Sequence, residues 1–206
     1  MCGPFESAVF PAVFAELAQK SGLEQPEVRR LAIQENIDRQ KNPNVSAVQA
    51  MDWDDILRVV GERLGVQLEA RAVEIAHSHA RPPYSAVLDN ADQVLKALAN
   101  PQRALVVATK GLRKYQLPVL DALGLTSLFA EILTPDSHNA LKKDRAFYGQ
   151  WPERTRLQIS VGDHYEDDVV APKSFGWKSV WKVNPPHGPA LETERFLRPE
   201  AFDYAP

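Results

Sequence analysis

Residues 157–177 read LQISVGDHYEDDVVAPKSFGW, and this stretch decides the fold. Its first five residues, Leu157 to Val161, favour a short β-strand, and the pair Gly162-Asp163 favours a turn directly after it. A run of acidic residues then leads into an apolar segment, Asp167 to Phe175, that predicts a helix ended by Gly176. A strand followed by a polar turn and a helix is the repeating unit of parallel α/β sheets.

Three further segments fit strands of the same sheet. Residues 104–108 (ALVVA) form an apolar run without polar alternation, which is typical of a strand covered on both faces. Residues 129–133 and 178–183 predict two more strands, and residues 112–123 predict a helix between the first two of these segments. Alternation of strands and helices predicts a parallel sheet with right-handed crossovers, whose carboxyl ends share one rim.

The N-terminal part of the chain predicts helices only. Apolar residues recur at helical spacing in four segments. The first expected helix begins or bends near Pro11, and the second begins at Pro26. A third is expected to start after a cap at Asp52, and a fourth to cover residues 68–79. We therefore expect a helical module over residues 5–83 and an α/β core over residues 84–206. The proline-rich end of the chain, from Asn184, predicts irregular structure with a short helix near residues 191–196.

Composition excludes several classes of protein. The 206 residues carry 24 basic and 27 acidic side chains, a net charge of −3, so no basic face for nucleic acid is expected. No apolar run reaches the length of about 20 residues that spans a bilayer. Cys2 is the single cysteine, and the N-terminus lacks the features of a signal peptide. A cytoplasmic protein without a membrane or nucleic-acid partner is the expectation, and the oligomeric state is left open.

Polar residues of complementary chemistry follow the predicted strands. Thr109-Lys110-Gly111 follows the first strand, Lys142 precedes a small predicted helix, and Asp163 with Asp168 follows the strand of the opening segment. Hydroxyl and backbone N–H groups bind phosphate oxygens, and an ammonium neutralises phosphoryl charge. Carboxylates bind Mg²⁺. These groups together predict a site for a phosphoryl group and a divalent cation.

The order of these segments resembles the second, third and fourth motifs of the haloacid dehalogenase-like (HAD) superfamily. Residues 162–177 resemble the fourth motif, residues 104–111 the second, and residues 141–144 the third, in which Lys143 replaces a common proline. The helical half resembles the helical cap of that family. The resemblance implies a Rossmann-like parallel-sheet core with a small cap, and hydrolysis of a small phosphorylated metabolite with Mg²⁺ as cofactor.

The resemblance also implies roles for individual residues. Thr109 is expected to bind the phosphoryl group, with Lys110 and Gly111 beside it in the substrate-binding segment. Lys142 is expected to stabilise both the nucleophile and the phosphoryl charge.

The metal site implied by the resemblance consists of acidic residues. Asp163 is expected to bind Mg²⁺, and Asp168 to hold the site together through a water on the metal or through Lys142. Asp167 is an alternative for the role of Asp168, because the spacing of the second acid varies.

Simpler alternatives exist for each of these residues. The Thr109 hydroxyl could bond a neighbouring backbone group, and one of Lys142 and Lys143 is expected to be solvated. One of the two adjacent acids, Asp167 and Asp168, could only favour the start of a helix. The four tryptophans are expected to be packing residues and not base-stacking platforms: Trp53, Trp151, Trp177 and Trp181.

The first HAD motif, a strand followed by Asp-x-Asp-x-Thr, is not found at its expected place. No aspartate precedes Asp38, so the first core strand and its nucleophile are expected to be absent from these residues. Asp52-Trp53-Asp54-Asp55 imitates the motif, but polar residues interrupt the segment before it and Ile56 stands in the place of the threonine. We interpret Asp52 as a helix cap. The expectation is that the natural chain extends upstream.

Three functions follow from the resemblance. The first is a Mg²⁺-dependent phosphomonoesterase that acts through an aspartyl-phosphate and is impaired here by loss of the nucleophile. The second is a non-catalytic module that binds phosphate and metal. The third is a dehalogenase of the same superfamily, which needs the nucleophile and no metal.

Overall fold

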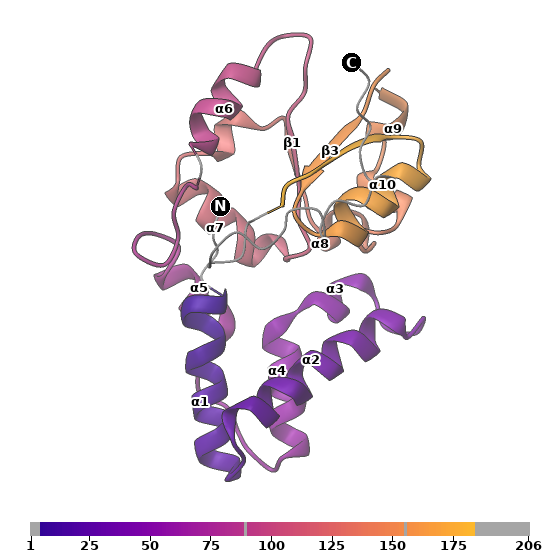
Figure 1. Cartoon of the computed structure of the whole chain (residues 1–206). Helices are drawn as coiled ribbons and strands as arrows, with labels where there is room; N and C mark the ends of the chain where they lie inside the picture. Colours follow the sequence, from indigo (N-terminus) through magenta and orange to yellow (C-terminus); the bar gives the residue numbers. More distant parts are fainter. Residues whose placement is uncertain (1–4, 89, 155, 184–206) are drawn as a thin grey trace, which may run out of the picture. The chain divides into compact units, whose positions relative to one another are not determined.

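The computed structural model describes residues 5–88, 90–154 and 156–183 (Figure 1). The chain forms two compact units, Met1–Leu141 and Lys142–Pro206, here called the first and second units. The predicted boundary near residue 83 marks a change in the type of element, and it lies inside the first unit. The short helix expected near residues 191–196 lies outside the described residues.

The first part of the first unit is helical, as expected. It contains a π-helical turn and five α-helices: η1 (Phe5–Val9), α1 (Phe10–Ser21), α2 (Gln25–Lys41), α3 (Ala47–Met51), α4 (Trp53–Arg63) and α5 (Ala72–Ser78) (Figure 1). Pro11 lies in the first turn of α1, where proline is tolerated, and the π-helical turn η1 leads directly into this helix. Gly22 ends α1 at a φ of 74°, a left-handed conformation that favours glycine. None of the described helices is both long and apolar enough to cross a lipid bilayer.

Apolar side chains at helical spacing hold these helices together. Val9, Val13 and Leu17 are fully buried along one side of η1 and α1, and they pack with Val28 of α2 and Leu57 of α4. Full burial of each such side chain contributes about 1.5–3 kcal/mol before the loss of chain entropy is counted. The same periodicity that predicted the helices therefore also forms their common core.

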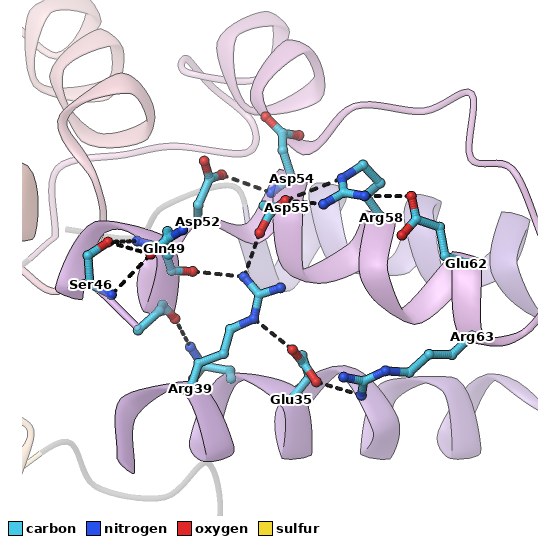
Figure 2. Close-up of polar contacts among 12 residues, drawn as sticks. Glu35, Arg39, Ser46, Gln49, Asp52, Asp54, Asp55, Arg58, Glu62 and Arg63 are labelled. Atoms are coloured by element: carbon cyan, nitrogen blue, oxygen red, sulfur yellow. Dashed lines mark hydrogen bonds and ion pairs between the residues drawn. The ribbon is translucent and has the colours of Figure 1, made fainter. Parts of the chain in front are cut away.

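A network of ion pairs joins α2, α3 and α4 (Figure 2). Arg39 of α2 lies 2.7 Å from Glu35 on its own helix and 2.7 Å from Asp55 of α4, and it donates to the Gln49 carbonyl oxygen at 2.9 Å. Arg63 reaches the second Glu35 oxygen at 2.6 Å. Burial raises the pKa of Asp55, but hydrogen bonds from Arg58 and Arg39 outweigh burial and hold the pKa below its ordinary value of 3.8.

Asp52 caps α4, as the sequence predicted. Its carboxylate accepts a hydrogen bond from the Asp54 backbone N–H at 3.2 Å (Figure 2). The Tyr115 hydroxyl donates to the same carboxylate at 2.8 Å, and the Lys114 ammonium lies 2.9 Å from its other oxygen. Asp54 accepts from the Val73 backbone N–H at 3.2 Å. Both carboxylates that imitate the nucleophile motif are therefore engaged in structural contacts.

The rest of the first unit is α/β. Its elements are α6 (Ala91–Leu98), β1 (Val106–Ala108), α7 (Arg113–Ala122), the 3-10 turn η2 (Thr126–Leu128), β2 (Glu131–Leu133) and α8 (Pro135–His138). β1 and β2 are parallel, with Val107 opposite Ile132. Leu120, Leu125 and Ile132 form a small buried cluster that packs α7 against this strand pair.

The second unit repeats the alternation of strands and helices. Its elements are the 3-10 turn η3 (Arg145–Tyr148), α9 (Trp151–Arg154), β3 (Ile159–Gly162), the π-helical turn η4 (Tyr165–Val170), α10 (Ala171–Ser174) and β4 (Lys178–Trp181). β3 and β4 are parallel, with Val161 opposite Val180 and Gly162 opposite Trp181. The expected helix over residues 167–175 is thus a π-helical turn followed by one short α-helix.

The described strands form two separate parallel pairs, β1 with β2 and β3 with β4. Each of these strands therefore has one backbone edge that no described strand pairs. On β3 the outward side chains Ile159 and Val161 are 55% and 66% exposed. The parallel α/β architecture is confirmed.

Candidate functional site

The second unit brings together three of the predicted site residues. Asp163 follows β3 at the carboxyl end of the strand, and Asp168 lies in the turn η4 that comes next. Lys142 approaches from the segment before η3. Thr109, Lys110 and Gly111 belong to the first unit, so their convergence with these residues remains a prediction.

Lys142 and Asp168 form a buried ion pair. The Lys142 ammonium lies 2.5 Å from one Asp168 oxygen, and the two side chains are only 11% and 4% exposed. Lys143, the next residue, is exposed. Lys142 is therefore the lysine that faces the candidate site, and Lys143 is the solvated one.

The backbone of η4 holds the Asp168 carboxylate in place. The His164 backbone N–H donates to its second oxygen at 3.0 Å, and the Asp168 N–H donates to the His164 carbonyl oxygen at 2.8 Å. Gly162 supplies the space that the carboxylate occupies, because a Cβ atom at this position would lie 2.2 Å from an Asp168 oxygen. Glycine is thus required at position 162 because a larger residue would collide with the Asp168 carboxylate.

Substitution Gly162→Ala is expected to destabilise the chain by about 1–3 kcal/mol, because the new methyl group displaces a carboxylate that is held on both oxygens. Thermal unfolding measures the loss, with Ser160→Ala in the same strand as the control. On an Asp168→Ala background the cost of Gly162→Ala should shrink, since the atoms that clash are gone. Equal costs on both backgrounds would contradict this account.

The donor chemistry of the second unit fits Mg²⁺. Asp163 is exposed, so its carboxylate is accessible to an ion, and a lysine-bound carboxylate lies at Asp168 in the turn that follows. No group of three or more acidic, histidine or cysteine side chains that could hold a metal occurs among the described residues. Mg²⁺ typically binds through one or two protein carboxylates and keeps several waters, so it needs no larger cluster. With both Asp168 oxygens engaged, Asp163 is the carboxylate best placed to bind it.

Asp167, the predicted alternative to Asp168, is also buried. Its residue is 8% exposed, and one carboxylate oxygen lies 3.0 Å from His164 Nδ1. Burial of both adjacent acids is unlike the exposed position expected of residues that only favour a helix start. The lysine contact belongs to Asp168, which makes Asp168 the partner of Lys142.

Sequence reasoning missed Tyr148, which is 4% exposed. Burial, followed by the negative charges of Asp168 and Asp167, raises the pKa of the Tyr148 hydroxyl. Its hydroxyl makes no hydrogen bond within the described part of the chain. The neutral phenol therefore adds no charge beside the two carboxylates. A tyrosine within an aromatic pair, Phe147-Tyr148, carries no sequence signal that separates it from an ordinary core residue.

In the first unit, Thr109 directly follows β1. Its backbone N–H donates to the Leu133 carbonyl oxygen at 3.1 Å, which continues the β1–β2 pairing by one residue. The Gly111 N–H donates to the Thr109 hydroxyl at 3.4 Å, a long and weak hydrogen bond. The hydroxyl thus makes the local backbone contact of the simpler alternative, and it keeps its own proton available for donation.

Comparison with solved structures identifies the fold. A HAD phosphatase from Thermococcus onnurineus matches with a TM-score of 0.63 at 22% identity, over 89% of this chain and 80% of that one. The HAD hydrolase YfnB from Bacillus subtilis, whose structure is bound to magnesium, matches with a TM-score of 0.63 at 14% identity, over 91% and 86% of the two chains. This chain has the HAD fold.

The HAD fold found here is shared with dehalogenases as well as phosphatases. The L-2-haloacid dehalogenase from Xanthobacter autotrophicus, with chloropropionic acid covalently bound, matches with a TM-score of 0.55 at 16% identity, over 82% of this chain and 70% of that one. No protein-family model and no curated protein sequence matches the chain. The predicted HAD resemblance is therefore confirmed at the level of the fold, and the reaction must be argued from the site.

Proposed function

We propose that the protein is a Mg²⁺-dependent phosphomonoesterase of the HAD type, acting on a small phosphorylated metabolite through an aspartyl-phosphate. The observation that supports the proposal is the buried ion pair between Lys142 and Asp168, whose carboxylate belongs to the turn that follows Asp163. A buried ammonium held by one carboxylate, near an exposed second carboxylate, suits a dianionic phosphoryl group and a divalent cation. The proposal keeps the cytoplasmic location expected from the sequence.

Each residue has a separate task in this proposal. Lys142 neutralises charge on the phosphoryl group and on the nucleophile, and Asp168 fixes the direction of the ammonium. Thr109 donates a hydrogen bond to a phosphoryl oxygen. Mg²⁺, when bound at Asp163, offsets the remaining negative charge of the phosphoryl oxygens.

The nucleophile is the part of the machinery that these residues do not supply. No described strand ends in Asp-x-Asp, and Asp52 and Asp54 are engaged in capping α4 and in contacts with α7 and α5. Loss of a covalent nucleophile lowers turnover on the order of 10³-fold or more. This favours, as the second candidate, a module that binds phosphate and metal without turnover.

An appended strand tests the proposal. We expect the 206-residue chain to hydrolyse p-nitrophenyl phosphate very slowly with Mg²⁺. An N-terminal extension that carries an apolar strand followed by Asp-x-Asp-x-Thr should raise turnover, because it supplies the nucleophile beside unpaired strand edges. The matched control carries Asn-x-Asn in the same extension and should show no gain.

The remaining outcomes separate the alternatives. Calorimetric binding of Mg²⁺ and phosphate by an extended chain that has no turnover would support the binding module. Turnover of a 2-haloacid that survives a chelator would support the dehalogenase instead, since that reaction needs no metal. An extended chain that neither binds Mg²⁺ nor acts on either substrate would contradict all three.

A further inference from the structure

Trp181 contacts the backbone of the residue that the proposed function assigns to the metal. It is the last residue of β4 and lies opposite Gly162 in the parallel pairing with β3. Its indole Nε1–H donates a hydrogen bond to the Asp163 carbonyl oxygen at 3.1 Å. The residue after it, Lys182, donates its backbone N–H to the Gly162 carbonyl oxygen at 2.8 Å.

These two hydrogen bonds hold the two peptide planes that flank the Asp163 Cα atom. The Gly162 carbonyl belongs to the plane before Asp163, and the Asp163 carbonyl belongs to the plane after it. The later plane is held at its other end too, because the His164 N–H donates to Asp168 at 3.0 Å. With both planes held, the direction of the Cα–Cβ bond of Asp163 is set by the backbone.

The Asp163 side chain has no comparable support from packing, because the residue is exposed. The indole, in contrast, is held by an edge-to-face contact with Tyr165, with ring centroids 5.0 Å apart and an interplanar angle of 60°. An oriented indole that bonds the Asp163 carbonyl oxygen holds the backbone from which this exposed side chain projects. This arrangement suits a carboxylate that must be in place before an ion arrives.

We propose that Trp181 is a positioning residue for Asp163, and that its indole N–H raises the affinity of the chain for Mg²⁺. The inference rests on the proposed function, because it assumes that Asp163 binds the ion. Trp181 itself touches neither the ion nor the substrate. Its action passes through the Asp163 carbonyl group.

Trp181→Phe in the full chain tests the inference, because phenylalanine keeps an aromatic ring beside Tyr165 and removes the N–H. Isothermal titration with MgCl₂ should show an affinity about 5- to 10-fold weaker than that of the wild type, because without the N–H the backbone at Asp163 must be ordered when the ion binds. The matched control is Trp177→Phe, whose ring packs on Tyr148 with centroids 4.6 Å apart in the same unit. The control should bind Mg²⁺ as the wild type does.

A second measurement needs no variant. In ¹⁵N-labelled wild-type chain the indole N–H resonance of Trp181 should shift on addition of Mg²⁺, while that of Trp53 stays unchanged. The Mg²⁺ concentration at the midpoint of the shift should agree with the affinity found by calorimetry.

Equal affinities of the wild type and Trp181→Phe for Mg²⁺ would overturn the positioning role and leave the metal site intact. Equal losses in both tryptophan variants would also overturn it, since they would indicate a general loosening of the unit. A wild-type chain that binds no Mg²⁺ would overturn the metal site and the inference together.

Discussion

Lys142→Met is expected to lower the free energy of unfolding of the second unit by about 3–5 kcal/mol, because it leaves the Asp168 carboxylate buried without its counter-charge. The Asp168 side chain is 4% exposed, so water cannot replace the lost ammonium without opening the turn. Hydrogen exchange at the amides of Val161 and Val180, in β3 and β4, measures the loss within this unit.

Two variants make this expectation specific. Lys143→Met alters the adjacent, exposed lysine and should change stability by less than about 0.5 kcal/mol. Asp168→Asn on the Lys142→Met background should recover part of the loss, because a neutral amide no longer carries a buried charge and still accepts from His164. Similar effects of the two lysine substitutions would show that the Lys142–Asp168 pair does not exist in solution.

Arg39→Ala is expected to destabilise the first unit by about 3 kcal/mol. Its guanidinium bonds Glu35, Asp55 and the Gln49 carbonyl oxygen from a position in which its side chain is only 10% exposed (Figure 2). Removal leaves Glu35, itself nearly buried, with Arg63 as its remaining partner. Chemical denaturation followed by circular dichroism should show the loss in the helical signal.

The control for this variant is Arg30→Ala in the same helix. Arg30 pairs with Glu27 at the surface, where both side chains are well exposed, and such pairs contribute about 0–1 kcal/mol. Alanine is a better helix former than arginine, so neither substitution loses helix propensity. A cost for Arg30→Ala equal to that for Arg39→Ala would therefore contradict the special weight given to the buried Arg39 contacts.

The pH dependence of stability gives a second test of Arg39. Burial raises the pKa of Asp55, but its arginine partners outweigh burial and lower the folded-state pKa below 3.8. A carboxyl with a lowered folded-state pKa contributes stability that is present above its unfolded-state pKa and is lost as pH falls through the folded-state value. In Arg39→Ala this acid-dependent loss should be smaller, which unfolding measurements between about pH 5 and pH 2 would show.

Local chemistry made much of the fold predictable. Three helix boundaries lie where the sequence indicated: Gly22 ends α1, Pro26 lies at the start of α2, and Asp52 caps α4. Each of these residues acts on backbone groups of its immediate neighbours. The helix expected over residues 68–79 begins only at Ala72. The Glu16 carboxylate accepts hydrogen bonds from the backbone N–H groups of Glu69 and Ala70 at 2.7 and 2.9 Å, in a segment that lies outside any helix. A contact so distant in the sequence has no local signal.

The candidate site likewise combines features that local sequence predicts with features that depend on distant contacts. The spacing of Gly162, Asp163 and Asp168 predicted that they would lie in one strand-turn segment, because all three are neighbours in the chain. The choice between Lys142 and Lys143 depended on which side chain the fold buries, and the pattern alone left it open. Trp181 was expected only to pack, because a hydrogen bond from an indole to a distant carbonyl leaves no trace in composition or spacing.

Among the described strands, β1 pairs only with β2 and β3 only with β4, and this pairing also affects how the chain folds. In each pair the two strands are joined by a single crossover of modest length, so neither of these pairings requires the closure of a long loop. Each unit can therefore acquire its strand pair independently, and opening of one pair need not disrupt the other. The two units should behave as separate cooperative foldons, each with its own rate of unfolding.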